Sequence, residues 1–244
     1  MGRAKRYVVG VHRRGRNDGG KGVHGSQKGA TMSTQRRPLA DNRFLQIVAG
    51  CYIVLWIALA IRPLDRSDWL LENLLVFATA IVLGLTYHRF QFSNLSYSLL
   101  VVFLALPTVG AHYSYAKVPI GFWLQHFFHL SRNHYDRLIH FSFGLLIVYP
   151  VRELLARSAG ARGAWALWLA FGGTIALSSL FEIIEAVVAQ VVRPDLGAAY
   201  LGTQGDIWDA QKDMTAAVLG AALTMILLLS SGRHRRARDP IRTA

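Results

Sequence analysis

Six long apolar runs, separated by short polar stretches, dominate the chain from Phe44 onwards. They cover residues 44–61, 69–87, 97–111, 138–155, 164–190 and 214–229. A bilayer core about 30 Å thick is crossed by about 20 helical residues at a rise of 1.5 Å each, and most of the runs approach that length. The third run is short and contains Pro107, which a membrane helix tolerates as a kink. The pattern predicts an all-α, polytopic bundle of six transmembrane helices.

The net charge of +13 comes entirely from the two ends of the sequence. Residues 1–43 hold 11 Lys/Arg against two acids, residues 231–244 hold five against one, and the part between them is neutral. Basic segments that flank apolar helices are typical of cytoplasmic ends that meet anionic lipid head groups. Two cytoplasmic ends require an even number of spans, so we expect an N-in/C-in topology. No motif that reads DNA or RNA accompanies the charge, which argues against a nucleic-acid partner.

This distribution divides the chain into three parts. Residues 1–43 are a basic leader whose composition favours disorder, residues 44–230 are the transmembrane domain, and residues 231–244 are a basic cytoplasmic tail. Met32 precedes a shorter basic leader. We therefore expect Met32 to be a candidate natural start, with the stretch before it an over-long gene prediction.

The predicted topology gathers acidic and histidine side chains on the outer side of the membrane. They come from the starts of the fourth and sixth helices and from the end of the fifth. These residues are Asp136, His140, Glu182, Glu185, Asp206, Asp209 and Asp213. Spacings of three, four and seven place those that share a helix on one face, provided that the segment around Asp206 is helical. Unpaired carboxylates cost several kcal/mol at low dielectric, so we expect them to face one another, a cation or water.

Three interpretations of this group stay open. Asp, Glu and His together suit Zn²⁺ or Mn²⁺, and carboxylates alone suit Mg²⁺ or Ca²⁺, any of which could activate water for ester or phosphoester hydrolysis. Carboxylates that gain and lose protons would instead suit an ion- or proton-coupled transporter. The third interpretation is structural, since nearby cations could hold the acids in salt bridges; these are Arg132, Arg137, Arg193 and Lys212.

The leading hypothesis is a metal-dependent activity on a lipid-linked or envelope substrate. All seven acidic and histidine residues are candidate metal ligands. The candidate catalytic residues are Asp136, His140, Glu182 and Asp209. Arg132 and Arg137 are candidates to meet a phosphate, and Gln204 and Gln211 to orient substrate or water. His126, His129 and His134 lie in or beside an aromatic-rich loop, which predicts a segment lying on the bilayer surface more readily than a ligand set.

Long polar motifs give the chain a family resemblance. Arg132-Asn133-His134-Tyr135-Asp136-Arg137, and the stretch from Leu201 to Asp213, resemble the YjdF-like family of bacterial inner-membrane proteins over about residues 44–230. The resemblance implies an inner-membrane location and no particular reaction. A weaker likeness to VanZ-type membrane proteins rests on residue pattern alone, and it favours a role at the outer face in envelope or glycan-lipid processing.

Overall fold

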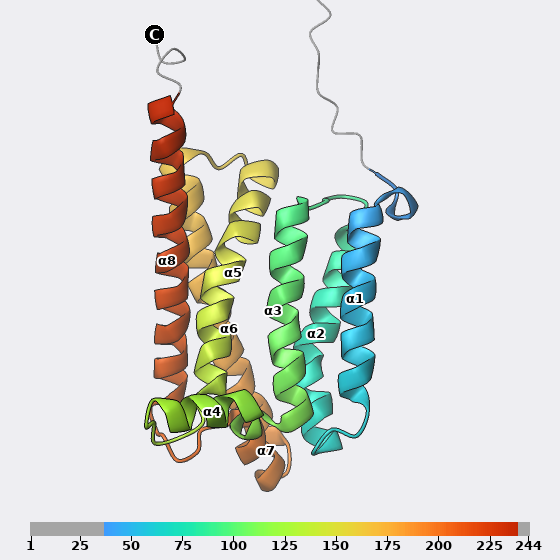
Figure 1. The fold of residues 1–244 in the computed structure, drawn as a ribbon, viewed down its shortest axis with the longest axis vertical. Helices are drawn as coiled ribbons and strands as arrows, with labels where there is room; N and C mark the ends of the chain where they lie inside the picture. The colour runs from blue at the N-terminus through green and yellow to red at the C-terminus, as the bar shows by residue number, and fades with distance from the viewer. Residues whose placement is uncertain (1–36, 239–244) are drawn as a thin grey trace, which may run out of the picture. The chain divides into compact units, whose positions relative to one another are not determined.

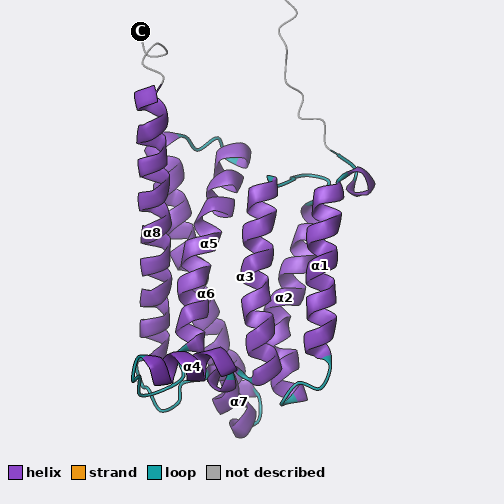
Figure 2. Ribbon diagram, in the orientation of Figure 1, coloured by secondary structure: helices purple, strands orange, loops and turns teal. Residues whose placement is uncertain are grey.

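The computed structural model describes residues 37–238, and all regular structure in this part of the chain is helical (Figure 2). The elements are η1 (Leu39–Asp41), α1 (Arg43–Ala60), α2 (Arg66–Thr86), α3 (Asn94–Tyr113), η2 (Tyr115–Lys117), α4 (Pro119–Phe127), α5 (Tyr135–Ser158), α6 (Gly163–Val191), α7 (Pro194–Leu201) and α8 (Asp209–Arg238). The predictions for the leader before residue 37, including the start at Met32, lie outside the described residues.

Six of these helices are long and apolar enough to cross a bilayer, which confirms the predicted number of spans. They are α1, α2, α3, α5, α6 and α8 up to Ser231. The structure describes every residue of α1, and none of them is buried, as expected for a helix that faces lipid. The third span is longer than predicted, with 20 residues that include Pro107. α1 begins and α8 ends at the same end of the bundle (Figure 1), which agrees with an even number of spans. Which end faces the cytoplasm stays a prediction.

The two short helices, α4 and α7, lie at the opposite end of the bundle, which we name the α4/α7 end (Figure 1). α4 runs across the long helices and leaves its aromatic side chains exposed, including Phe122 and Trp123. The bilayer-surface segment predicted here is therefore helical. His126 and His129 are exposed at its end.

α5 and α8 pack more closely than any other pair, because glycines stand at their contact. A Cβ atom on Gly144 would collide with the backbone of α8 at Ala217, and one on Gly220 would collide with the backbone of α5 at Phe141. Small residues allow membrane helices to approach in this way. The Thr224 hydroxyl of α8 adds a hydrogen bond to the Leu145 carbonyl of α5, at 2.5 Å.

Hydroxyl groups lie beside carbonyls near the proline inside α3. Pro107 cannot donate a backbone N–H, which weakens the hydrogen bonding of the preceding turn. In that turn the Thr108 hydroxyl donates to the Leu104 carbonyl at 2.7 Å, and the Tyr135 hydroxyl of α5 donates to the Leu106 carbonyl at 2.9 Å. The carbonyl that loses its helical donor to Pro107 is that of Phe103, so these two hydroxyls add bonds to neighbouring carbonyls and hold α3 beside α5.

At both limits of the predicted transmembrane domain, regular structure continues beyond the apolar runs, and the division into leader, domain and tail stays a prediction. The backbone of Arg37 exchanges hydrogen bonds with the Gln91 side chain, and its carbonyl also accepts one from the Tyr87 hydroxyl. The last residues of the predicted leader are therefore held against the turn between α2 and α3. At the other end, α8 continues to Arg238, beyond the predicted limit of the last apolar run at residue 229.

Asp65 caps the start of α2, and this cap gives a testable stability effect. Its carboxylate accepts hydrogen bonds from the backbone N–H groups of Ser67, at 2.7 Å, and Asp68, at 3.0 Å. These two bonds lower the pKa of Asp65 below its ordinary value of 3.8. We expect Asp65→Ala to lower the free energy of unfolding by about 1 kcal/mol, the usual cost of losing such a cap.

The pH dependence of this effect follows from the direction of the pKa shift. Because the pKa is lower in the folded protein, the stabilisation is fully present above 3.8 and disappears as the pH falls through the folded-state value. Unfolding of both proteins in detergent at neutral and strongly acidic pH measures it. An Asp65→Ala deficit that stays constant down to strongly acidic pH would contradict the assignment.

Candidate metal centre

Three spanning helices bring four of the predicted side chains together at the α4/α7 end. Asp136 and His140 lie one turn apart at the start of α5, Glu182 comes from α6 and Asp213 from α8. The His140 Nε2 atom is 3.7 Å from Asp136 Oδ1 and 3.3 Å from Glu182 Oε1. Asp136, His140 and Asp213 each offer a ligand atom, and all three atoms lie within 4.8 Å of one another. The arrangement is compact enough for a single cation.

Most of these side chains are buried, and two of them have oxygens without a hydrogen-bond partner. The side chains of Asp213, His140 and Glu182 are 3%, 7% and 9% exposed. Among residues 37–238, Asp213 Oδ1 and Glu182 Oε1 make no hydrogen bond, although the latter lies close to His140. An unsatisfied buried carboxylate oxygen is costly, and a bound cation removes that cost. A mixed set of imidazole and carboxylate groups suits Zn²⁺ or Mn²⁺.

An ionic network lies beside this cluster and occupies the other predicted aspartates. Arg132 Nη1 is 2.8 Å from Asp209 Oδ1, and Arg137 Nη2 is 3.1 Å from the same atom. Arg137 and Lys212 each approach Asp206 Oδ2 to 2.6 Å. The hydrogen bond from Lys212, with that from Arg137 adding to it, holds the pKa of Asp206 well below its usual range. Asp206 and Asp209 therefore already have cationic partners, unlike Glu182.

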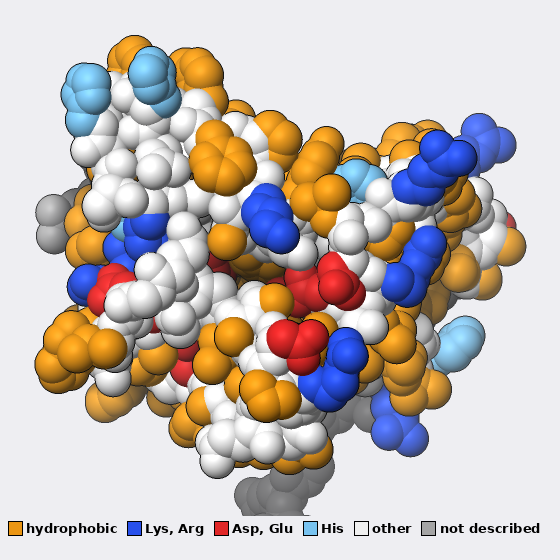
Figure 3. Space-filling view, turned by 90° about the horizontal axis from the view of Figure 1, so that it is seen from below, with side chains coloured by type: hydrophobic (Ala, Val, Ile, Leu, Met, Phe, Trp, Pro, Cys, Tyr) orange, Lys and Arg blue, Asp and Glu red, His pale blue; other side chains and the backbone are white. Residues whose placement is uncertain are grey.

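The two groups together carry an excess of negative charge. Counted by formal charge, the five carboxylates outnumber the three cations of the ionic network by two; the carboxylates belong to Asp136, Glu182, Asp206, Asp209 and Asp213. Figure 3, which looks onto this end, shows Asp and Glu side chains at several separate places on the face, with Lys and Arg side chains among and around them. This imbalance favours binding of a cation over binding of a second anion.

Glu185 belongs to a neighbouring polar group around Tyr115 of η2. Burial raises the pKa of the Tyr115 hydroxyl well above its usual value, and the carboxylates of Glu72, Asp136 and Glu185 add to the shift. Both oxygens of Asp68, one turn before Glu72 on α2, are buried without a hydrogen-bond partner in the described chain. Sequence reasoning did not place Tyr115 or Asp68 in the site. The only signal for Asp68 is its spacing of four from Glu72.

The predicted glutamines do not reach the cluster. Gln204 forms two hydrogen bonds with the backbone of Asn133, at 2.8 and 3.3 Å, and so joins the loop before α8 to the loop before α5. Gln211 is exposed, and its side chain makes no hydrogen bond within residues 37–238. Their roles toward a substrate stay predictions.

The sequence places Asp206, Asp209 and Asp213 on one helix face only if the segment around Asp206 is helical, and the structure shows that it is not. The helix begins only at Asp209, and Asp206 lies in the preceding turn. The predicted stripe of three aspartates therefore reduces to Asp209 and Asp213. Asp206 reaches the ionic network from the loop.

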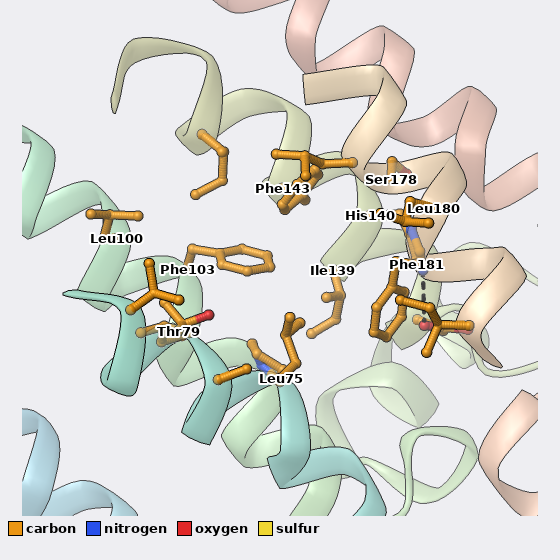
Figure 4. Close-up of a pocket in the computed structure, with 18 of the residues that line it drawn as sticks. Leu75, Thr79, Leu100, Phe103, Ile139, His140, Phe143, Ser178, Leu180 and Phe181 are labelled. Atoms are coloured by element: carbon orange, nitrogen blue, oxygen red, sulfur yellow. Dashed lines mark ion pairs between the residues drawn. The ribbon is translucent and has the colours of Figure 1, made fainter. Parts of the chain in front are cut away.

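An apolar cavity of about 450 Å³ adjoins the cluster and extends into the membrane-spanning part of the bundle (Figure 4). Side chains of α2, α3, α5 and α6 line it, among them Leu75, Leu100, Phe103, Ile139, Phe143 and Phe181. Its polar boundary consists of Asp136, His140 and Tyr115, with the hydroxyls of Thr79 and Ser178 as the other polar groups. The cluster therefore stands at one end of a largely hydrophobic space.

The comparison with known proteins identifies the family. The family model described as "Predicted membrane protein (DUF2238)" matches residues 44–234. The chain belongs to this family. The chain is also 40% identical over 167 residues to the inner membrane protein YjdF of Escherichia coli (strain K12), an alignment that covers 67% of this chain and 78% of that protein. No solved structure matches the chain.

The family assignment confirms the resemblance to YjdF-like proteins. The family assignment and the six apolar helices together identify this chain as a multi-pass protein of the inner membrane. The likeness to VanZ-type proteins stays a prediction.

Proposed function

We propose that Asp136, His140 and Asp213 bind a divalent cation beside Glu182, and that the protein hydrolyses a phosphoester or ester of a lipid-linked substrate at that cation. One observation carries the proposal. A compact, buried set of one imidazole and three carboxylates stands at the polar end of an apolar cavity among membrane-spanning helices. Two of its carboxylate oxygens make no hydrogen bond within residues 37–238: Asp213 Oδ1, which lies 3.8 Å from Arg137 Nε, and Glu182 Oε1, which lies 3.3 Å from His140 Nε2.

The geometry suggests a division of roles. Asp136, His140 and Asp213 present ligand atoms within 4.8 Å of one another, and three protein ligands leave a position for water on a catalytic metal. A cation held by these residues would lower the pKa of a water molecule toward neutrality. Glu182, 3.3 Å from His140 and otherwise unpartnered, is placed to accept the proton of that water. The water oxygen attacks the phosphorus or carbonyl carbon, the bond to the alcohol breaks, and the alcohol leaves with the proton.

Arg137 is the best placed residue to meet an anionic head group. Its side chain is 21% exposed, whereas that of Arg132 is 9% exposed and also donates to the carbonyls of Thr203 and Gly202. A phosphate could exchange with Asp206 on Arg137, since both are anions that accept from a guanidinium group.

Metal content tests the proposal directly. We expect the purified protein, after removal of loosely bound ions, to retain close to one equivalent of Zn²⁺ or Mn²⁺ in elemental analysis. Asp213→Asn should lower this content at least tenfold, because the amide is a much weaker ligand than the carboxylate. Lipid-phosphate hydrolysis should fall with it.

Asp195→Asn is the matched control for this experiment. It makes the same change at the same end of the bundle, at a side chain that is 73% exposed and, within residues 37–238, forms an ion pair only with Arg193, across 3.7 Å. Melting curves in detergent check that each variant is folded. Absence of metal from the folded wild-type protein would overturn the proposal.

The ionic network supports a second, structural role for the remaining residues. Arg132 is almost fully buried, and its guanidinium contacts Asp209 and the loop before α8. This contact pattern favours holding α8 against the start of α5 over direct chemistry. The structural interpretation thus applies to Asp206 and Asp209, and the metal interpretation to the four convergent side chains.

A further inference from the structure

The apolar cavity is lined by α2 on one side and by α6 on another, and lining residues of both helices are exposed on the surface of the bundle. α2 packs on α3 and α7, while α6 packs on α5, α7 and α8, so that the two helices form the two sides of a gap. Lining residues on both sides are about half exposed: Val82 on α2, and Leu177, Leu180 and Ile184 on α6. These side chains lie within membrane-spanning segments, where exposed surface meets acyl chains and not water.

The cavity also has the depth that a lipid tail requires. Along α5 it extends from Asp136 to Ile147, a distance of about 16 Å at 1.5 Å per residue. This is roughly half of a bilayer hydrocarbon core. Leu83 of α2 and Leu100 of α3 line it as well. A molecule in the cavity would thus have one end at Asp136 and His140 and the other end deep in the membrane.

A space of this size is unusual in a protein interior, and its lining suits an apolar occupant better than water. Protein interiors contain few voids larger than a water molecule, whereas this one measures about 450 Å³. Ordered water needs two to four polar partners, and most of the lining offers none. Its volume lies within the range of small-molecule binding pockets.

We infer that one alkyl chain of a bilayer lipid occupies this cavity, admitted laterally between α2 and α6, and that its head group lies at Asp136, His140 and Tyr115. The inference rests on the proposed function for the reaction but not for the binding itself. It narrows the substrate class to amphiphiles already in the bilayer, with a long apolar chain joined to a compact head group.

Photo-crosslinking in vesicles tests the inference. The full chain is reconstituted with a phosphatidic acid that carries a diazirine halfway along one acyl chain, illuminated, digested and mapped by mass spectrometry. Crosslinks are expected at buried lining residues such as Phe103, Leu104 and Ile147. Ala78→Trp, which places a large ring at an exposed lining position, should reduce them at least fivefold.

Ala80→Trp is the matched control, because Ala80 is exposed on the same helix and does not line the cavity. Its crosslinks should equal those of the wild type. The wild-type map decides the question even if Ala78→Trp fails to fold. Crosslinks confined to positions that face lipid outside the cavity, such as Val54 and Leu85, would overturn the inference.

Metal analysis of the same samples separates this inference from the proposed function. Cavity crosslinks in Asp213→Asn protein that has lost its metal would support the lipid site independently of the reaction. A metal-loaded wild-type protein without cavity crosslinks would refute the lipid site and leave the metal centre standing.

Discussion

Asp209→Ala is expected to lower the free energy of unfolding by about 3–5 kcal/mol, the usual cost of breaking a buried ion pair by removing one partner. Asp209 is 4% exposed, and it is the carboxylate that Arg132 and Arg137 share, at 2.8 and 3.1 Å. Without it, the guanidinium of Arg132 remains buried with its main counter-charge gone. Unfolding by titration with a denaturing detergent, followed by circular dichroism, measures the difference.

Asp195→Ala serves as the control for this prediction. Its ion pair with Arg193 spans 3.7 Å between side chains that are more than 70% exposed, so we expect a change within about 0.5 kcal/mol. Asp209→Asn should fall between the two, because the amide oxygen still accepts a hydrogen bond. Equal stability of Asp209→Ala and Asp195→Ala would show that the ionic network does not hold α8 in place.

Gly144→Leu is expected to prevent native packing of α5 on α8 altogether. A Cβ atom at this position would overlap the Ala217 carbonyl oxygen, which is backbone and cannot rotate away. The two helices would have to separate along their length, so we expect a loss above about 4 kcal/mol or no folded protein. Fluorescence-detected size-exclusion chromatography of the expressed protein reports this outcome.

Gly172→Leu provides the comparison, because Gly172 lies in α6 with no atom within 4 Å of the position its Cβ would take. The same change there should leave the elution profile intact. A monodisperse, stable Gly144→Leu protein would mean that α5 and α8 do not approach as closely as described.

The sequence allowed the spanning helices to be predicted because their signal is local. Each apolar run reports its own burial in lipid, whatever its neighbours do. The pairing of Asp136 with His140 was also local, as a spacing of four on one helix. The prediction that Glu182 and Asp213 lie at the same side of the membrane as Asp136 and His140 required only the direction of each helix. Successive spans alternate in direction, so the order of the helices provides it.

Other features depend on contacts between distant segments, and the sequence could not reveal them. Residues 202–205 adopt left-handed backbone angles at Gly202, Gln204 and Gly205, with φ of 59°, 47° and 86°, so that Asp206 lies in a turn. The spacing of the aspartates is equally compatible with a helix there. Glu153 of α5 accepts hydrogen bonds from Ser93 and Ser96 at the start of α3, which required knowing that α3 and α5 are neighbours. The cavity likewise depends on the separation of α2 and α6.

The ionic network has a consequence for the order of events during synthesis. The chain is made from its N-terminus, so Arg132 and Arg137 emerge 72 or more residues before Asp209, their main partner. At translation rates of about 5–20 residues per second, the two arginines are synthesised roughly 4 to 15 s before Asp209. During that time Gly144 also lacks the α8 backbone that it contacts in the finished bundle. The earlier spans therefore form the surface on which α8 packs when it is inserted. Its insertion brings Asp209 to Arg132 and Arg137, and it covers the face of α5 that contains Gly144.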